Sequence, residues 1–135
     1  VTVPELGTFS AVARPIVVLT SNRSRELHDA LKRRCYYHWI EYPDIERSAD
    51  IVRRRVPSAG SDLVHAATAF VSSTRSLDLD KPPGLAEAID WVTALQTLGV
   101  TSLDHARTRS TIGSIAKTPD DVVVVTAALE DQVAS

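Results

Sequence analysis

The first part of the chain alternates between apolar runs and one charged segment. Residues 16–19 form a continuous apolar run, which predicts a strand buried on both faces. Residues 24–34 follow with apolar positions at helical spacing and are predicted to form a helix, capped by Asn22 or Ser24. Residues 36–41 are aromatic and β-branched and predict a second strand. The pattern therefore predicts strand, helix and strand, which is an α/β arrangement.

After residue 43 the apolar positions recur at helical spacing, which indicates helices alone. Five segments share this spacing: residues 43–57, 58–77, 81–100, 101–117 and 118–135. Gly113 weakens the helical pattern of the fourth segment. The last segment has four consecutive valines, which favour a strand, but Thr118 and Pro119 are typical of a helix start, and we expect a helix. The predicted fold class is mainly α, with a helical-bundle domain at 44–135 after an α/β remnant at 1–43.

Composition narrows the classes to which the protein can belong. The 135 residues fit one average domain, or a small domain with a fragment of another. The net charge of −2 argues against a nucleic-acid binder, which normally carries a basic excess. No apolar run approaches the roughly 18 residues that a membrane span requires. We therefore expect a cytoplasmic protein with neither nucleic acid nor a membrane as partner, and the lack of methionine indicates a piece of a longer chain.

Polar residues at both ends of the predicted first helix are candidates for chemistry. Asn22 follows the first predicted strand, and ligands of α/β folds bind at the carboxyl ends of parallel strands. Capping of the helix is the alternative role for this side chain. Arg33 and Arg34 end the helix, where the helix dipole favours cations. Because two adjacent residues cannot both lie along one helix face, at least one arginine projects elsewhere, and arginine is well suited to stabilise a transferring phosphoryl group.

The sequence does not predict a metal site. His28, Cys35 and His38 are the only soft ligands that lie near one another in the chain, and Cys35 and His38 fall in different predicted elements. Zinc usually takes four ligands, and the remaining histidines, His65 and His105, are remote in sequence. We therefore expect packing and hydrogen-bonding roles for these residues, and the single cysteine also excludes an internal disulfide.

Two stretches resemble a known family. The segment PIVVLTSNRSRELHDALKRRCYYHWIEYPD, residues 15–44, resembles the C-terminal part of the core of MoxR-type AAA+ ATPases, in the branch linked with carbon monoxide dehydrogenase maturation. The segment KPPGLAEAIDWVTAL, residues 81–95, is similar to the helix of the lid domain that normally carries sensor 2. The resemblance implies that Asn22 is sensor 1. It also implies that Arg34, directly before Cys35, is the arginine finger, with Arg33 as the alternative.

The chain departs from this family in two respects. It contains neither the phosphate-binding pattern G-x-x-x-x-G-K-[ST] nor an apolar strand that ends in Asp-Glu, so we expect no ATP hydrolysis by this chain alone. The sensor 2 arginine is also absent. Lys81 is the only cation near the start of that helix, so we assign it the contact with the nucleotide phosphates. A solvated lysine is the alternative.

The resemblance also implies cofactors and partners. ATP and Mg²⁺ would belong to the full-length protein, and we expect neither to bind this fragment. The partners would be identical subunits in a ring and a client protein, for example a metalloenzyme undergoing maturation. The strands at 16–21 and 36–41 would lack their sheet neighbour, so we expect them to pair with each other or with another copy. A non-enzymatic helical interaction module is the competing class, and a DNA-binding use of the basic segment 44–56 is a third that the balanced charge disfavours.

Overall fold

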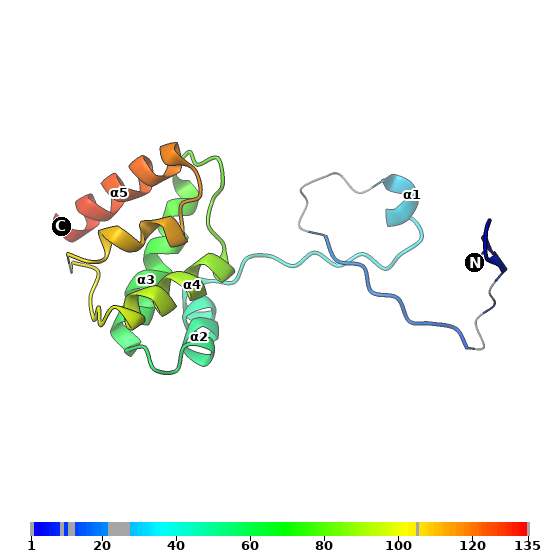
Figure 1. The fold of residues 1–135 in the computed structure, drawn as a ribbon, viewed down its shortest axis with the longest axis horizontal. Coiled ribbons are helices and arrows are strands. Elements are labelled where there is room, and N and C mark those ends of the chain that lie inside the picture. Colours follow the sequence, from blue (N-terminus) through cyan, green and yellow to red (C-terminus); the bar gives the residue numbers. More distant parts are fainter. Residues whose placement is uncertain (1, 9, 11–12, 22–27, 105, 135) are drawn as a thin grey trace. The chain divides into compact units, whose positions relative to one another are not determined.

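Helices account for most of the secondary structure in this protein, which is mainly helical. The computed structural model describes residues 2–8, 10, 13–21, 28–104 and 106–134. The chain divides into two units, Val1–Ile40 and Glu41–Ser135, which are described separately below (Figure 1).

The N-terminal unit has little regular structure among its described residues. A small antiparallel hairpin joins β1, Thr2–Val3, to β2, Gly7–Thr8. Gly7 has a φ of +87°, a left-handed conformation that glycine adopts without steric cost and that the tight turn requires. The helix of this unit, α1, spans only Asp29–Lys32 and buries none of its residues.

The strand predictions in this unit are wrong. Residues 13–21 and 36–40 contain no strand, and the sheet of the described chain consists of β1 and β2 alone. The apolar side chains of both segments are exposed, with Ile16 at 95%, Val18 at 81% and Ile40 at 82% of full exposure. A strand exists only where a neighbour completes its hydrogen-bond ladder, and the described residues provide no such neighbour. The expected pairing of these two segments with each other is therefore not present here, and their pairing with another copy stays a prediction.

The helix predicted over residues 24–34 is also corrected. His28 has non-helical backbone angles, with φ −55° and ψ 134°, so the helix begins at Asp29 and ends at Lys32. The cap expected at Asn22 or Ser24 lies outside the described residues. Short helices are marginal unless tertiary packing supports one face, and α1 buries no side chain against a core. The absence of that packing explains why the helix is so short.

The unit Glu41–Ser135 is a helical bundle. Its helices are α2 (Ile45–Arg55), α3 (Ser61–Ser73), η1 (Thr74–Ser76), α4 (Leu85–Thr97), η2 (Arg109–Ser114) and α5 (Pro119–Ala134), of which η1 and η2 are 3₁₀ helices. Helix α2 packs on α3 and α4, α3 also packs on α4, and η2 lies between α4 and α5. Figure 1 shows α5 and α2 on opposite sides of this bundle. Four of the five predicted helices are confirmed.

Local hydrogen bonds delimit three of the confirmed helices. The Asp44 carboxylate caps α2 by accepting the Arg47 backbone N–H at 2.7 Å. The Thr118 hydroxyl caps α5 by accepting the Asp121 N–H at 3.1 Å. Helix α4 ends at Gly99, which has a φ of +69°, and the N–H of the next residue, Val100, donates to the Leu95 carbonyl at 3.0 Å, as in a Schellman motif.

The helix predicted within residues 101–117 is present only as the short 3₁₀ helix η2. Two hydroxyl groups compete for its backbone carbonyls: Ser110 donates to Arg107 and Thr111 donates to Thr108, both at 2.7 Å. Ile112 and Ile115 are both buried, and their spacing of three residues suits the 3₁₀ repeat. Side-chain competition and the three-residue repeat together account for the replacement of an α-helix.

A single hydrophobic core holds the helical unit together. Trp91 is fully buried at its centre, with its ring 5.5 Å from that of Phe70. The Trp91 indole Nε1–H donates to the Thr111 hydroxyl at 2.7 Å, which satisfies its only polar group. Trp91 is therefore part of the core. The other fully buried large apolar residues are Leu95, Ile112, Ile115, Val52, Val64, Val71, Val92 and Val125.

Candidate functional site

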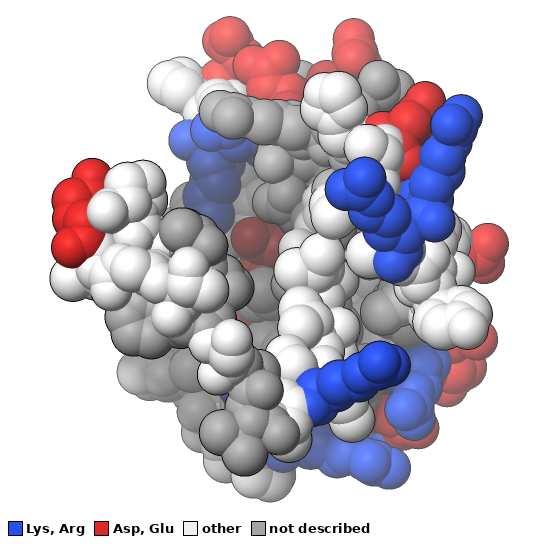
Figure 2. All heavy atoms as spheres, turned by 90° about the vertical axis from the view of Figure 1, so that its right-hand side faces the viewer, with Lys and Arg blue, Asp and Glu red and all other residues white. Residues whose placement is uncertain are grey.

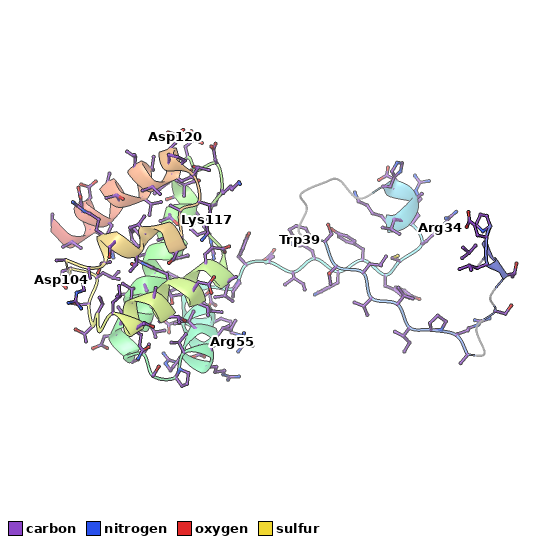
Figure 3. All side chains as sticks on the ribbon, in the orientation of Figure 1. Arg34, Trp39, Arg55, Asp104, Lys117 and Asp120 are labelled. Carbon is purple, nitrogen blue, oxygen red and sulfur yellow. The ribbon has the colours of Figure 1, made fainter. Side chains whose placement is uncertain are left out.

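The arginine pair lies in a turn at the end of α1. Arg33 is the C-cap, with its N–H donating to the Asp29 carbonyl, and the Arg34 N–H donates to the Leu31 carbonyl, both at 3.0 Å. Both side chains are exposed. Figure 3 shows Arg34 projecting from the chain just after α1. The backbone hydrogen bonds thus fix the turn while leaving the two guanidinium groups at the surface.

Neither arginine has an acidic partner among the described residues. The ion pair at this helix joins Lys32 to Asp29 instead, at 3.8 Å. A guanidinium presents five donors in a planar fork that matches carboxylate and phosphate oxygens. Chemically, the exposed pair could therefore contact an anion supplied from outside the described part of this unit.

The predicted sensor residue Asn22 lies outside the described residues. The structure therefore neither places its side chain nor relates it to Arg34. Its assignment stays a prediction from the sequence.

Lys81 lies in the loop before α4, in the helical unit. Its side chain is exposed, and it forms no ion pair with a described residue. Its backbone N–H donates to the Asp121 carboxylate at 3.3 Å, and the Asp80 N–H donates to the same carboxylate at 2.9 Å. Lys81 and the two arginines belong to different units, so neither unit contains all three predicted cations.

Asp121 is the structural basis of the Lys81 loop, a role that the sequence did not predict. Only 2% of the residue is exposed, and it is the one buried residue with an ionisable side chain among those described. It lies in the first turn of α5, where the helix dipole favours a negative charge, and two backbone amides satisfy its oxygens. Its role could not be found from the sequence because its partners lie 40 residues or more away.

A second contact that the sequence did not predict joins Arg75 to Tyr42. The guanidinium carbon of Arg75, in η1, lies 4.4 Å from the centroid of the Tyr42 ring. The Arg75 Nε atom is buried and has no hydrogen-bond partner among the described residues. A cation over an aromatic face is attracted by the ring quadrupole, so this contact holds Arg75 in place of an ion pair.

The arginines of α2 form a solvated face. Arg53, Arg54 and Arg55 are all exposed, and Arg53 pairs with Asp50 at 2.5 Å. Figure 2 shows Lys and Arg side chains at the surface of the molecule, among Asp and Glu side chains. Exposed ion pairs of this kind contribute about 0–1 kcal/mol, so they define the charge of the surface more than the stability of the fold. These arginines therefore belong to a solvated face of α2.

The described residues contain no group of three or more His, Cys, Asp or Glu side chains arranged to hold a metal ion. None of the described helices combines the length and apolar character that crossing a bilayer demands.

Comparisons with protein-family models, with curated proteins and with solved structures found no match to this chain.

Proposed function

We propose that this chain is the C-terminal portion of a MoxR-type AAA+ ATPase, comprising the end of its α/β core and its helical lid. The parent protein would be a cytoplasmic ring of identical subunits that remodels a client protein or matures a metalloenzyme. The resemblance over residues 15–44 and 81–95 motivates the proposal. The observation that carries it is the exposed Arg34, held by a short turn without an acidic partner among the described residues.

The exposed apolar segments of the N-terminal unit support the same proposal. Residues 16–19 and 36–40 have the composition of core strands, yet their apolar side chains are exposed. Leaving such side chains in water forgoes about 1.5–3 kcal/mol for each residue of this size. This is the state expected of core strands whose remaining sheet lies elsewhere in a longer protein. The helical unit Glu41–Ser135, by contrast, contains its own core and corresponds to the lid in this proposal.

Each predicted site residue has a role in the proposed mechanism. Asn22 orients the attacking water in its own subunit, and Lys81 contacts the nucleotide phosphates from the lid. Arg34 reaches the γ-phosphate bound by the adjacent subunit and stabilises the charge of the transition state, with Arg33 as the alternative donor. A phosphate-binding loop, which this sequence does not contain, would hold ATP and Mg²⁺, and these supply the phosphoryl group and neutralise its charge.

The first test is to translate the gene upstream of Val1. A phosphate-binding loop and an Asp-Glu strand within about 150 residues, a typical domain length, would support the proposal. Their absence would instead support the non-enzymatic interaction module. The exposed apolar segments of the N-terminal unit are the observation that favours this alternative, because exposed apolar surface commonly marks a site of protein contact.

The second test replaces Arg34 by alanine in the full-length protein. Turnover of ATP should fall by a factor of order 10³ or more, while ATP affinity stays unchanged, because a finger acts on the transition state at a neighbouring subunit. Arg33→Ala tests the alternative donor, and Lys32→Ala, which removes a neighbouring exposed cation, is the matched control. Mixing Arg34→Ala subunits with subunits that lack the phosphate-loop lysine should restore part of the activity. Equal losses of binding and turnover, or no recovery on mixing, would show that Arg34 is not a finger acting in trans.

A further inference from the structure

The contact between Tyr42 and Arg75 lies where the helical unit begins. The first unit ends at Ile40 and α2 starts at Ile45, so Tyr42 belongs to the short segment that leads into the bundle. The Tyr42 residue is 71% exposed and has one face against the Arg75 guanidinium, at 4.4 Å. This stacking connects the entry segment to the far end of α3, where η1 begins.

Arg75 is held firmly on the bundle side of this contact. Its neighbour Thr74 is fully buried and donates its hydroxyl to the Val71 carbonyl at 2.8 Å. The backbone then turns, because the Leu77 N–H donates to the Thr74 carbonyl at 3.1 Å. With its Nε buried and unpartnered, Arg75 makes no ion pair or hydrogen bond with the described residues through its side chain. Among the described residues, the Arg75 guanidinium therefore contacts the Tyr42 ring in place of an acidic partner.

Two more contacts continue the attachment from Tyr42 to α2. The Ser48 hydroxyl donates to the Pro43 carbonyl at 3.4 Å, and the Asp44 carboxylate accepts from Arg47 at 2.7 Å. Residues 42, 43 and 44 thus each contact the helical unit. The preceding residues 36–40 are all exposed and have no regular structure. The attachment of the chain to the bundle begins at Tyr42.

We propose that the Tyr42–Arg75 pair sets the end of the flexible connection between the two units. The pair fixes residues 42–44 on the helical unit, so that only residues before Tyr42 are free to move. Loss of the pair would lengthen the mobile connection toward Asp44, the cap of α2. The inference does not depend on ATP hydrolysis and applies equally to an ATPase lid or an interaction module.

The test uses the ¹⁵N-labelled 135-residue chain and measures backbone heteronuclear NOEs for residues 36–48. In the unmodified chain the values should rise from residue 42 onward to those of α2. In Arg75→Met, residue 42 should become as mobile as residues 38–40, while α2 stays ordered; Pro43 has no amide proton and is not observed. Cleavage after Glu41 by a glutamate-specific protease should rise about two- to fivefold, the factor that corresponds to an exposed cation–π contact. Arg54→Met, which removes an exposed arginine of α2, is the matched control and should change neither quantity.

Additional variants keep the test decisive. Tyr42→Phe retains the ring face and should behave as the unmodified chain, whereas Tyr42→Leu should reproduce the Arg75→Met result at an exposed position that does not threaten folding. The Tyr42→Leu/Arg75→Met double variant should be no more mobile than either single variant. Far-UV circular dichroism reports whether the helical unit has stayed intact. Unchanged NOEs in both single variants, additive effects in the double variant, or a residue 42 already as mobile as residue 40 in the unmodified chain would each overturn the proposal.

Discussion

The two units use similar apolar residues in opposite ways. In the N-terminal unit, Ile16, Val18 and Ile40 are almost completely exposed, whereas in the helical unit Val52, Val92 and Ile115 are completely buried. The difference arises because helix α2 and its neighbours present their apolar positions on one face toward other helices. Apolar runs without a packing neighbour have nowhere to be buried. An apolar sequence therefore indicates that a segment can be buried, but the segment is buried only where another element packs against it.

The largest expected effect is that of Trp91→Ala. Removing this fully buried ring leaves a cavity and removes the hydrogen bond that the Thr111 hydroxyl accepts, so the helical unit should lose about 3–5 kcal/mol of stability. Urea denaturation followed by far-UV circular dichroism measures the loss. Tyr36→Ala, at a fully exposed aromatic residue of the other unit, is the control and should leave the denaturation midpoint unchanged. Similar losses in the two variants would remove the contrast between the units.

Asp121→Ala should have the next largest effect. The variant leaves the backbone amides of Asp80 and Lys81 without their acceptor, which should lower the free energy of unfolding by about 1–3 kcal/mol. The adjacent and exposed Asp120 offers a matched control in Asp120→Ala. Amide hydrogen exchange at residues 80 and 81 should accelerate in the first variant only. Unchanged exchange at these amides would show that the carboxylate does not hold the loop.

Gly99→Ala should cost about 1 kcal/mol. Gly99 has a φ of +69°, which an alanine adopts only with strain, so the end of α4 should be weakened. Gly113→Ala is the control, because that glycine has no positive φ and an added Cβ meets no atom within 4 Å. Thermal unfolding of the two variants should differ in Tm by several degrees, with Gly99→Ala the lower. If the Tm of Gly99→Ala equals that of the control, the positive φ at position 99 does not strain an alanine.

Ile16→Ser should have the smallest effect on stability. The side chain is 95% exposed and contributes almost nothing to the fold of this chain. The free energy of unfolding should therefore change by less than about 0.5 kcal/mol. Light scattering at high concentration should show less self-association than for the unmodified chain, because an exposed apolar segment has been interrupted. A clear loss of stability would indicate that residues 16–19 are buried in solution.

The helices of the second unit could be predicted because their determinants are local. Asp44 caps α2, Thr118 caps α5 and Gly99 ends α4, each within a few residues of the helix that it delimits. The four valines of α5 favour a strand by propensity, yet its cap and Pro119 correctly indicated a helix. The strands at 16–19 and 36–41 were mispredicted because a strand depends on a neighbour that a local pattern does not specify.

The candidate site was predictable only in part for the same reason. The sequence indicated Arg33 and Arg34 by residue type and position, and the structure adds that both are exposed. The Asp121 contacts with the Lys81 loop and the stacking of Arg75 on Tyr42 join residues far apart in the chain. No periodicity or motif marks such pairs, because each is created only when the bundle closes.

The buried Asp121 carboxylate makes the last helix and the entrance to α4 depend on each other. A protease cut or an engineered stop between residues 117 and 121 would remove more than a terminal helix, since the amides at positions 80 and 81 would lose their acceptor. The domain therefore has a minimal length: trimming its C-terminus back to η2 would loosen a loop near its middle, and fusion partners are better attached after residue 134 than in place of α5.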